Sequence, residues 1–419
     1  MNRIILIGNG FDLAHDLKTS YQNFIDWLWR KKINRIKQCD SKLYADGMIY
    51  FQRIDGKSIK ENWPDGMDSY NKLVHNINAD NKFHNILREL LYDNKFFKII
   101  TEKNSLQNWV DIEEEYYKLL QKIIKKSSLN DEETYANIKQ LNNDFSQIKK
   151  ELVGYLLEET TQGIGGSAIE FIDGAIYENI YSKFELRDFT KEGVAGLVEE
   201  KYQDYLIDCN VGGQVPLREQ WEHDNDLTSI ASYPTDRDYY NRKTREGEME
   251  LMPLENILFL NFNYTKTERD YSEHKDIETQ TIHIHGELNN PNNPIIFGYG
   301  DEIGKEYEEI ENVNDNDFLE NIKSIRYSDT SNYKKPLDYI DSDKYQIFLL
   351  GHSCGLSDRT LLSTLFEHIN CVSIKPFYHK KEDGTDNYSD IVRNISRHFK
   401  DKAMMREKVA NKKYCKPLS

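Results

Sequence analysis

Continuous runs of apolar residues, each ending at a glycine or polar turn, lie at both ends of this chain. Two more strands are predicted at residues 293–301 and 371–379, and the continuous apolar runs themselves are residues 4–7, 257–262 and 345–350. Such runs are typical of strands that are buried on both faces of a parallel sheet. Residues 281–288 instead alternate, with Ile282 and Ile284 on one face and His283 and His285 on the other. The two ends of the chain therefore predict the strands of one sheet.

Apolar residues at helical spacing follow the first turn and fill the middle of the chain. The first helix is predicted after a capping box in which Thr19 is the N-cap. Residues 107–126 place Ile112, Tyr116 and Leu119 on one stripe, and a second helix is predicted from residue 130 to the glycines at 163–166. Residues 210–255 are polar, contain three prolines and show no sustained period.

The order of these elements predicts an α/β fold with an open, mostly parallel, Rossmann-like sheet. Residues 1–30 and 255–400 would form the nucleotide-binding core, and residues 31–254 a large helical insertion or cap. Residues 401–419 form a basic C-terminal tail that is expected to fray. Ligands of such sheets bind at the carboxyl ends of the strands, so the turns there are the places to look for chemistry.

Composition narrows the classes of protein that this chain can belong to. Its 419 residues are 38% hydrophobic and carry a net charge of −16, which predicts a soluble protein and makes nucleic acid an unlikely partner. The five cysteines are odd in number and lack metal-binding spacing, which indicates a reducing, cytoplasmic location and no metal cofactor. No apolar run approaches the ~20 residues of a membrane span, and no signal peptide is predicted.

The first candidate turn is Gly8-Asn9-Gly10, followed by Asp12. Glycines allow a backbone to approach a phosphate, although a tight turn alone would also demand them. The third glycine of the dinucleotide fingerprint is replaced by Leu13, which disfavours a hydride-transfer site.

Asparagine and histidine occupy the ends of the next two predicted strands. Asn261 and Asn263 are either turn formers or amides that position a water or a ribose hydroxyl. His283 and His285, before Gly286, are either a metal-binding pair, a general base with a packed neighbour, or core histidines.

The last candidate turn follows the predicted strand at residues 345–350 and precedes a helix. Gly351, Ser353, Ser357 and Asp358 would form a seat for a phosphate or ribose, with Ser357 as the helix cap. Residues 351–355 also match the G-x-S-x-G nucleophile elbow, but no acid and histidine with a hydrolase signature follow. Asp111 and Glu115 share a helix face that could border the pocket, although such charge runs are usually solvated.

Taken together, these stretches resemble the AbiH family of bacterial abortive-infection, or phage-defence, proteins. The matching stretches are "ILIGNGFDLAHDLKTSYQNF", "WVDIEEEY", "NFNYT", "IHIHGEL", "IFGYGD" and "GHSCGLSD". The order of the turns is also similar to the sirtuin-type NAD-binding fold. That resemblance implies catalytic roles for Asn263 and His285 over the nicotinamide ribose. It implies binding roles for the residues of the glycine and serine turns, here Gly8, Asn9, Gly10, Asp12, Asn261, Gly286, Gly351, Ser353, Ser357 and Asp358.

Three departures from these patterns affect the interpretation. The chain lacks the four-cysteine zinc ribbon of sirtuin deacetylases, so protein deacylation is not expected. Thr265 stands where the sirtuin pattern has an aspartate, and Asp16 stands where the AbiH pattern has a glycine. A negative Asp16 near a phosphate would be unfavourable unless its side chain points away.

The leading hypothesis is an antiphage effector that hydrolyses NAD⁺, its substrate, at the nicotinamide–ribose bond. Asn263 would position water or a ribose hydroxyl, and His285 would act as the general base. One alternative is a non-catalytic sensor that binds a nucleotide. A second is a metal-dependent hydrolase or nuclease that uses His283 and His285. A phage protein as trigger and a homo-oligomeric assembly are further expectations.

Overall fold

The fold of the chain is described from a computed structural model. It describes residues 1–61, 63–83, 88–107, 111–125, 135–163, 173–189, 253–302 and 304–418, with a few isolated residues between 196 and 207. The polar segment at residues 210–255, the start of the second predicted helix and Cys209 lie wholly or almost wholly outside these ranges. The other four cysteines, Cys39, Cys354, Cys371 and Cys415, are free thiols.

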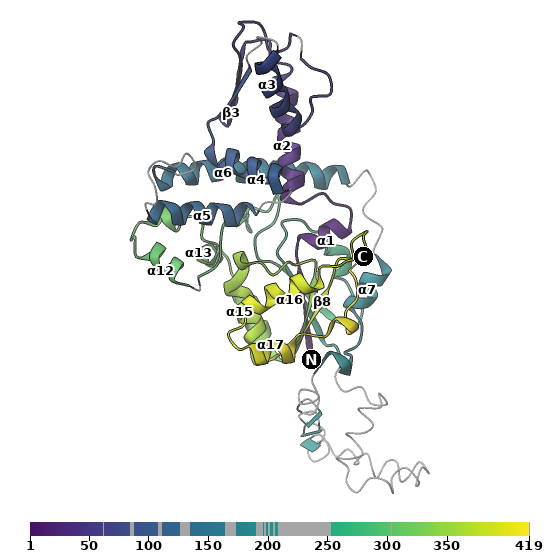
Figure 1. Ribbon diagram of the computed structural model, residues 1–419. Coiled ribbons are helices and arrows are strands. Elements are labelled where there is room, and N and C mark those ends of the chain that lie inside the picture. The colour runs from purple at the N-terminus through teal and green to yellow at the C-terminus, as the bar shows by residue number, and fades with distance from the viewer. Residues whose placement is uncertain are drawn as a thin grey trace.

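A five-stranded, fully parallel sheet forms the lower half of the molecule (Figure 1). Its strand order is β6-β5-β1-β7-β8. The strands are β1 (Asn2–Ile7), β5 (Asn256–Asn261), β6 (Glu278–His283), β7 (Tyr345–Leu350) and β8 (Cys371–Phe377). The first strand lies at the centre, flanked by strands that come more than 250 residues later, which confirms a mostly parallel α/β sheet. Between β1 and β7 the strand order reverses, and this is where ligands of open α/β sheets bind.

Helices cover both faces of this sheet, so the central strands are apolar on both sides. On one face Ile4, Leu6 and Leu258 pack against α14 (Lys334–Ser342), α15 (Arg359–Glu367) and α16 (Tyr388–Arg397). On the other face Ile5 and Ile7 pack against α1 (Asn9–Ala14) and α7 (Gly174–Ile180). Burial on both faces explains why the strands appear in the sequence as unbroken apolar runs.

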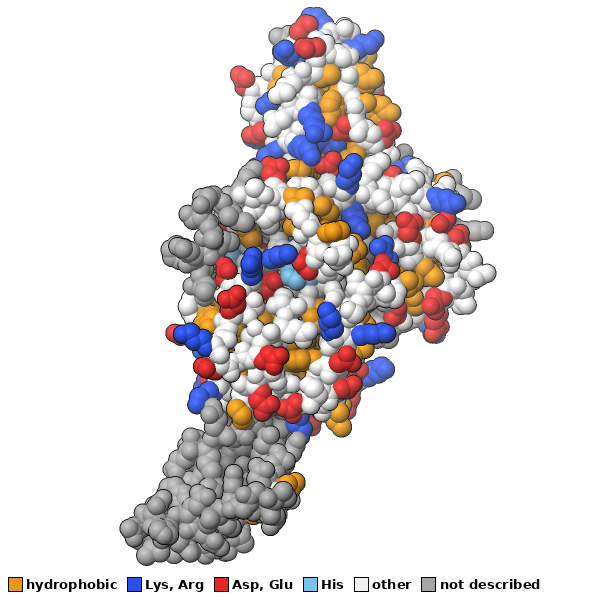
Figure 2. Space-filling model, turned by 180° about the vertical axis from the view of Figure 1, so that it is seen from behind, with side chains coloured by type: hydrophobic (Ala, Val, Ile, Leu, Met, Phe, Trp, Pro, Cys, Tyr) orange, Lys and Arg blue, Asp and Glu red, His pale blue; other side chains and the backbone are white. Residues whose placement is uncertain are grey.

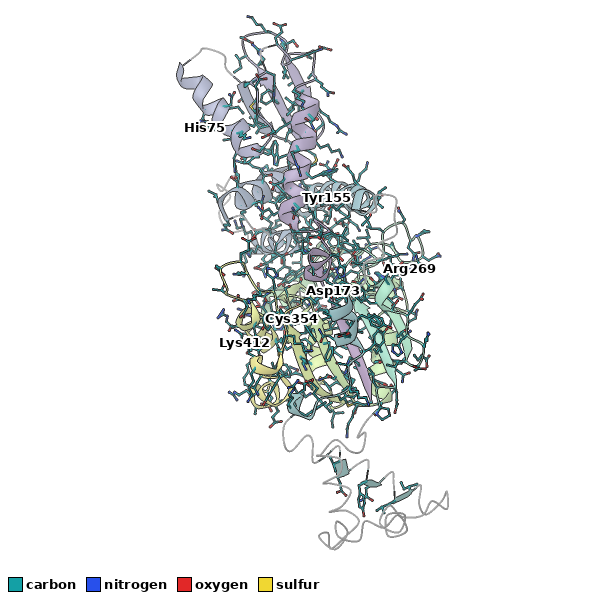
Figure 3. The ribbon with its side chains drawn as sticks, turned by 90° about the vertical axis from the view of Figure 1, so that its right-hand side faces the viewer. His75, Tyr155, Asp173, Arg269, Cys354 and Lys412 are labelled. Carbon is teal, nitrogen blue, oxygen red and sulfur yellow. The ribbon has the colours of Figure 1, made fainter. Side chains whose placement is uncertain are left out.

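A layer of long helices lies across the carboxyl edge of the sheet (Figure 1). It contains α4 (Lys95–Gln107), α5 (Ile112–Lys125) and α6 (Ile138–Gly163), and α2 (Tyr21–Ile36) connects it to an upper lobe. Figure 3 marks the three levels, with His75 in the upper lobe, Tyr155 in the helical layer and Cys354 near the edge of the sheet.

The insertion differs from the helical cap predicted for residues 31–254, because the upper lobe holds a small antiparallel sheet beside α3 (Tyr70–Phe83). Its strands, in the order β2-β3-β4, are Leu43–Ala45, Ile49–Arg53 and Arg88–Tyr92. Alternating burial in β3, with Ile49 and Phe51 inside, shows that one face of this sheet packs on the core of the lobe.

Part of the predicted core range packs with the helical layer. Leu288, Phe297 and Ile310 were expected in the nucleotide-binding core, but they pack in the same apolar cluster as α2, α4, α5 and α6. Residues 293–301 form no strand; Tyr299 makes one isolated bridge to Ile322, just before α13 (Lys323–Arg326). This segment, with α12 (Lys305–Glu311), joins the helical layer to the sheet.

The C-terminal residues do not fray as the sequence suggested. They form α17 (Lys402–Lys408), and Val409 and Pro417 make bridges to Ile374 and Tyr378 along β8 and just beyond it. The Lys408 ammonium is buried and donates to the carbonyls of Phe366 and His368. Backbone bridges to the edge strand β8 therefore keep residues 401–418 folded, although their basic composition alone indicates a solvated tail.

The first long helix begins one residue later than its predicted cap implies. Ser20 is the N-cap of α2, and its hydroxyl accepts a hydrogen bond from the Asn23 amide at 3.1 Å. The Thr19 hydroxyl instead donates to the Asn9 side chain. Thr19 therefore ties the helix start to the first glycine turn.

Asp16 is exposed and follows α1 in the left-handed region, with φ of 60°. This conformation explains why a glycine suits the position, since glycine adopts positive φ without steric cost.

We expect Asp16→Gly to raise the free energy of unfolding by about 0.5–1 kcal/mol, measured by urea denaturation. Asp16→Ala, which removes the same charge but keeps a Cβ, should give no gain. Equal effects of both would contradict a backbone origin.

Figure 2 shows acidic and basic side chains interspersed over the described part of one face. Its described side chains form no continuous basic area of the kind that binds a nucleic-acid backbone. In the part of the chain that the structure describes, every helix is too short or too polar to cross a membrane.

Candidate functional site

A cavity of about 400 Å³ lies between the carboxyl edge of the sheet and the helical layer. Nine of the twelve predicted site residues line it: Gly8, Asn9, Gly10, Asp12, Asn263, His285, Gly351, Ser353 and Asp358. Its upper wall comes from Tyr21 on α2, Asp111 and Glu113 at the start of α5, and Leu152 and Leu156 on α6. The volume is within the range of small-molecule sites in proteins.

The two glycine turns pack directly on each other where the strand order reverses. Gly8 and Gly10 donate their amides to the carbonyls of Leu350 and Gly351, at 3.2 and 2.9 Å. Gly351 has φ of 74°, and a Cβ there would lie 2.0 Å from the Phe11 nitrogen. Close packing of β1 and β7 therefore accounts for these glycines without a phosphate, although both turns border the cavity.

Asn263 is held at the end of β5 by hydrogen bonds on both sides. Its amide nitrogen donates to the Gly8 carbonyl at 3.0 Å, and its backbone amide donates to Asn261 Oδ1 at 2.8 Å. Asn261 lies behind the cavity wall and donates to Glu268 Oε2 at 2.6 Å. Asn263 is therefore placed to contact a ligand, while Asn261 is placed to orient the loop that carries it.

The two histidines of the alternating strand contact different carboxylates. His283 Nε2 lies 2.9 Å from Glu268, outside the cavity, whereas His285 Nε2 lies 3.1 Å from Asp358. They do not converge on one metal position. Among the described residues, no group of three or more His, Cys, Asp and Glu side chains is arranged as a metal site requires.

Lys323, at the start of α13, links the two walls of the cavity. Its ammonium lies 2.9 Å from Glu113 Oε2 and 3.1 Å from Asp358 Oδ1, and its side chain is 1% exposed. Glu113 also accepts the Gly298 amide at 3.1 Å. Neither Lys323 nor Glu113 was predictable as a site residue, because a single lysine in a polar segment and one acid in a run of three carry no pattern.

The pKa values of two site carboxylates are shifted in opposite directions by their surroundings. Burial raises the pKa of Glu113 to about 7, although the Lys323 ammonium acts against it. The pKa of Asp358 is also pushed up by burial, but Lys323 and His285 outweigh burial and hold it well below its usual range. Carboxylates whose pKa values are driven apart are typical of acid–base sites.

His285 is a buried imidazole whose pKa is lowered, first by burial and then by the Lys323 ammonium. Its Nδ1 lies 3.2 Å from the Phe262 carbonyl, which can only accept a hydrogen bond, and its Nε2 lies 3.2 Å from the Tyr327 hydroxyl. A neutral imidazole held in this way can accept a proton at neutral pH.

Three predicted site residues lie outside the cavity lining, namely Asn261, Gly286 and Ser357. Gly286 is needed by the turn after β6, where φ is 86° and a Cβ would lie 2.3 Å from the Pro294 carbonyl oxygen. Ser357 does not cap α15; Asp358 occupies the cap position and turns its carboxylate into the site instead. Glu115, considered for the pocket mouth, pairs with Lys103 and Lys118, while Asp111 caps α5 and lines the cavity.

Comparison with known proteins gives one match. A family model described as bacteriophage abortive infection AbiH matches residues 4–379. The chain belongs to the AbiH family. The description of the AbiH family supports a role in abortive infection during phage defence. No curated protein and no solved structure matches the chain significantly.

Proposed function

We propose that this AbiH protein is an abortive-infection effector that hydrolyses NAD⁺ at the bond between nicotinamide and ribose. The observation that carries the proposal is the convergence of Asn263, His285 and Asp358 in one buried cavity at the strand ends. Numbered along the chain, the sheet strands have the order 3-2-1-4-5, with the cavity at the reversal. This order supports a Rossmann-like, dinucleotide-binding core.

The charge of the cavity suits a reaction that develops positive charge. Asp12, Asp111, Glu113 and Asp358 line it, against the single ammonium of Lys323 among its described lining residues. Cleavage of an N-glycosidic bond passes through an oxocarbenium-like state, which nearby carboxylates stabilise. The pyridinium of NAD⁺ is itself cationic and would be attracted to the same lining.

In the proposed reaction, a water oxygen forms a bond to the anomeric carbon of the nicotinamide ribose. The electron pair of the broken carbon–nitrogen bond goes to the ring nitrogen, and neutral nicotinamide leaves. His285 takes the proton of the water, and Asn263 orients the water or the ribose. The products are nicotinamide, ADP-ribose and one proton.

The proposal is tested by incubating purified protein with NAD⁺ and separating nicotinamide and ADP-ribose by chromatography. We expect Asn263→Ala to slow nicotinamide release by about 100-fold, because the reacting groups lose their alignment. Asn256→Ala, at the first residue of the strand that leads to Asn263, is the matched control and should keep the native rate. Absence of nicotinamide release, both from the purified protein and in phage-infected cells, would contradict the proposal.

A nucleotide sensor is the second candidate, and one contact favours it. Lys323 connects Glu113 of the helical layer to Asp358 at the sheet edge, so a ligand between them could shift one layer against the other. Binding of NAD⁺ without release of nicotinamide would support the sensor.

A further inference from the structure

Asp12 on α1 has one carboxylate oxygen that lacks a hydrogen-bond partner among the described residues. Its side chain is 1% exposed and lines the cavity. Oδ2 accepts the Thr265 hydroxyl at 2.6 Å, while Oδ1 is buried and unpartnered. Buried polar atoms are almost always hydrogen-bonded, so an orphan oxygen at a cavity wall indicates a donor that arrives with a ligand.

The surroundings of Asp12 define what kind of donor can bind there. Burial raises its pKa to about 6, against the Thr265, Thr267 and Asn263 side chains, and the charge of Glu268 adds to this rise. Glu268 is itself held by Asn261 and His283. Asp12 is therefore mainly ionised at neutral pH and can only accept hydrogen bonds. An ionised carboxylate repels a phosphate and attracts a hydroxyl or N–H group.

We propose that Asp12 Oδ1 accepts the 2′-hydroxyl of the ribose whose glycosidic bond is cleaved, so the site selects ribosyl over 2′-deoxyribosyl ligands. This inference rests on the proposed function. Asp12, Asn263 and Thr265 line the same cavity, and the Thr265 hydroxyl binds Oδ2 of Asp12. Oδ1 is therefore the Asp12 oxygen left to accept a hydrogen bond from a sugar in the cavity that Asn263 also lines. Hydrogen bonds to the 2-hydroxyl strengthen as the anomeric carbon becomes cationic, which lets Asp12 contribute to catalysis as well as to binding.

The experiment measures binding of ribose 5-phosphate and 2-deoxyribose 5-phosphate by calorimetry at pH 7.5. We expect the native protein to bind the ribose compound about tenfold more tightly, because a charge-assisted hydrogen bond is lost with the deoxy compound. In Asp12→Asn the two affinities should agree within about twofold. The matched control is Asp16→Asn, which removes the same charge from an exposed position four residues away and should keep the tenfold preference.

A second readout is independent of ligand. Burial penalises the ionised form of Asp12 in the folded state. The free energy of unfolding therefore falls as the pH rises from about 4, the ordinary pKa of an aspartate, to about 6, the pKa of Asp12 in the folded protein. Asp12→Asn should therefore raise the melting temperature by roughly 3 °C at pH 7.5 and have little effect at pH 4. Equal affinity of the native protein for the two sugars, or binding of neither, would overturn the inference.

The two proposals fail in different ways. A ribose preference that depends on Asp12, without release of nicotinamide from NAD⁺, would refute the proposed hydrolysis and support the proposed ribose site. Release of nicotinamide without a preference for ribose would refute the proposed ribose site and support the proposed hydrolysis.

Discussion

Replacement of Lys323 by methionine is expected to lower the free energy of unfolding by about 3–5 kcal/mol. The ammonium is 1% exposed and sits between Glu113 and Asp358, whose side chains are 8% and 10% exposed. Removing it leaves two carboxylates buried without their cation, a penalty larger than the loss of the ion pairs themselves. Urea denaturation at pH 8 measures the change.

A matched variant separates this effect from loss of a lysine in general. Lys118→Met removes an ammonium that is 48% exposed and pairs with the exposed Glu114 and with Glu115, which keeps Lys103 as a second cation. Lys118→Met should lower the free energy of unfolding by less than about 1 kcal/mol, because solvent screens ion pairs that have an exposed partner. Equal losses for the two variants would show that Lys323 does not compensate buried charge.

The pH dependence of the Lys323 variant follows from Glu113. The pKa of this carboxyl is raised by burial to about 7, above its ordinary value, even with the ammonium beside it. Without the ammonium the pKa rises further, so Glu113 takes up a proton more readily. The loss should therefore be smaller at pH 6 than at pH 8. Adding Glu113→Gln to the Lys323 variant should restore part of the lost stability at pH 8.

Replacement of His285 by glutamine is expected to slow nicotinamide release by about 10²–10⁴-fold, the usual contribution of a general base. Burial and Lys323 lower the pKa of this imidazole, so the native rate should rise with pH below the ordinary histidine value and level off near neutrality. That rise should be absent from the variant. Rates from pH 4.5 to 8 at saturating NAD⁺ provide the test.

His283→Gln provides the matched control two residues earlier. Burial lowers the pKa of His283, but the Glu268 carboxylate outweighs burial and raises it above the ordinary value. The pair therefore stabilises the fold fully below about pH 6.5 and less as pH rises through the folded-state pKa. This variant should lose stability at pH 6 and keep most of its turnover. A larger loss of turnover than in His285→Gln would contradict the assignment of the base.

Much of the fold was predictable because it depends on local pattern. The apolar runs at residues 4–7, 257–262 and 345–350 predicted strands buried on both faces, and the structure places them side by side in one parallel sheet. The strand predicted at residues 293–301 was wrong. Its apolar side chains are divided between two cores, because Phe297 and Tyr299 pack with the helical layer and Ile296 packs with the sheet, and its backbone forms no strand. A short apolar run looks the same in the sequence whether it forms a buried strand or a buried segment without regular structure.

The sequence by itself determined the parallel sheet, its carboxyl-end turns and the family, since these depend on periodicity, glycine spacing and motif order. Nine of the twelve predicted site residues come from those turns and line the cavity. Only the tertiary structure decided which side chains complete it. Glu113 and Lys323 are separated by 210 residues and meet through the packing of the helical layer on the sheet. The orphan oxygen of Asp12 is likewise a product of burial, because solvation and contact are properties of the folded chain that no residue type or spacing encodes.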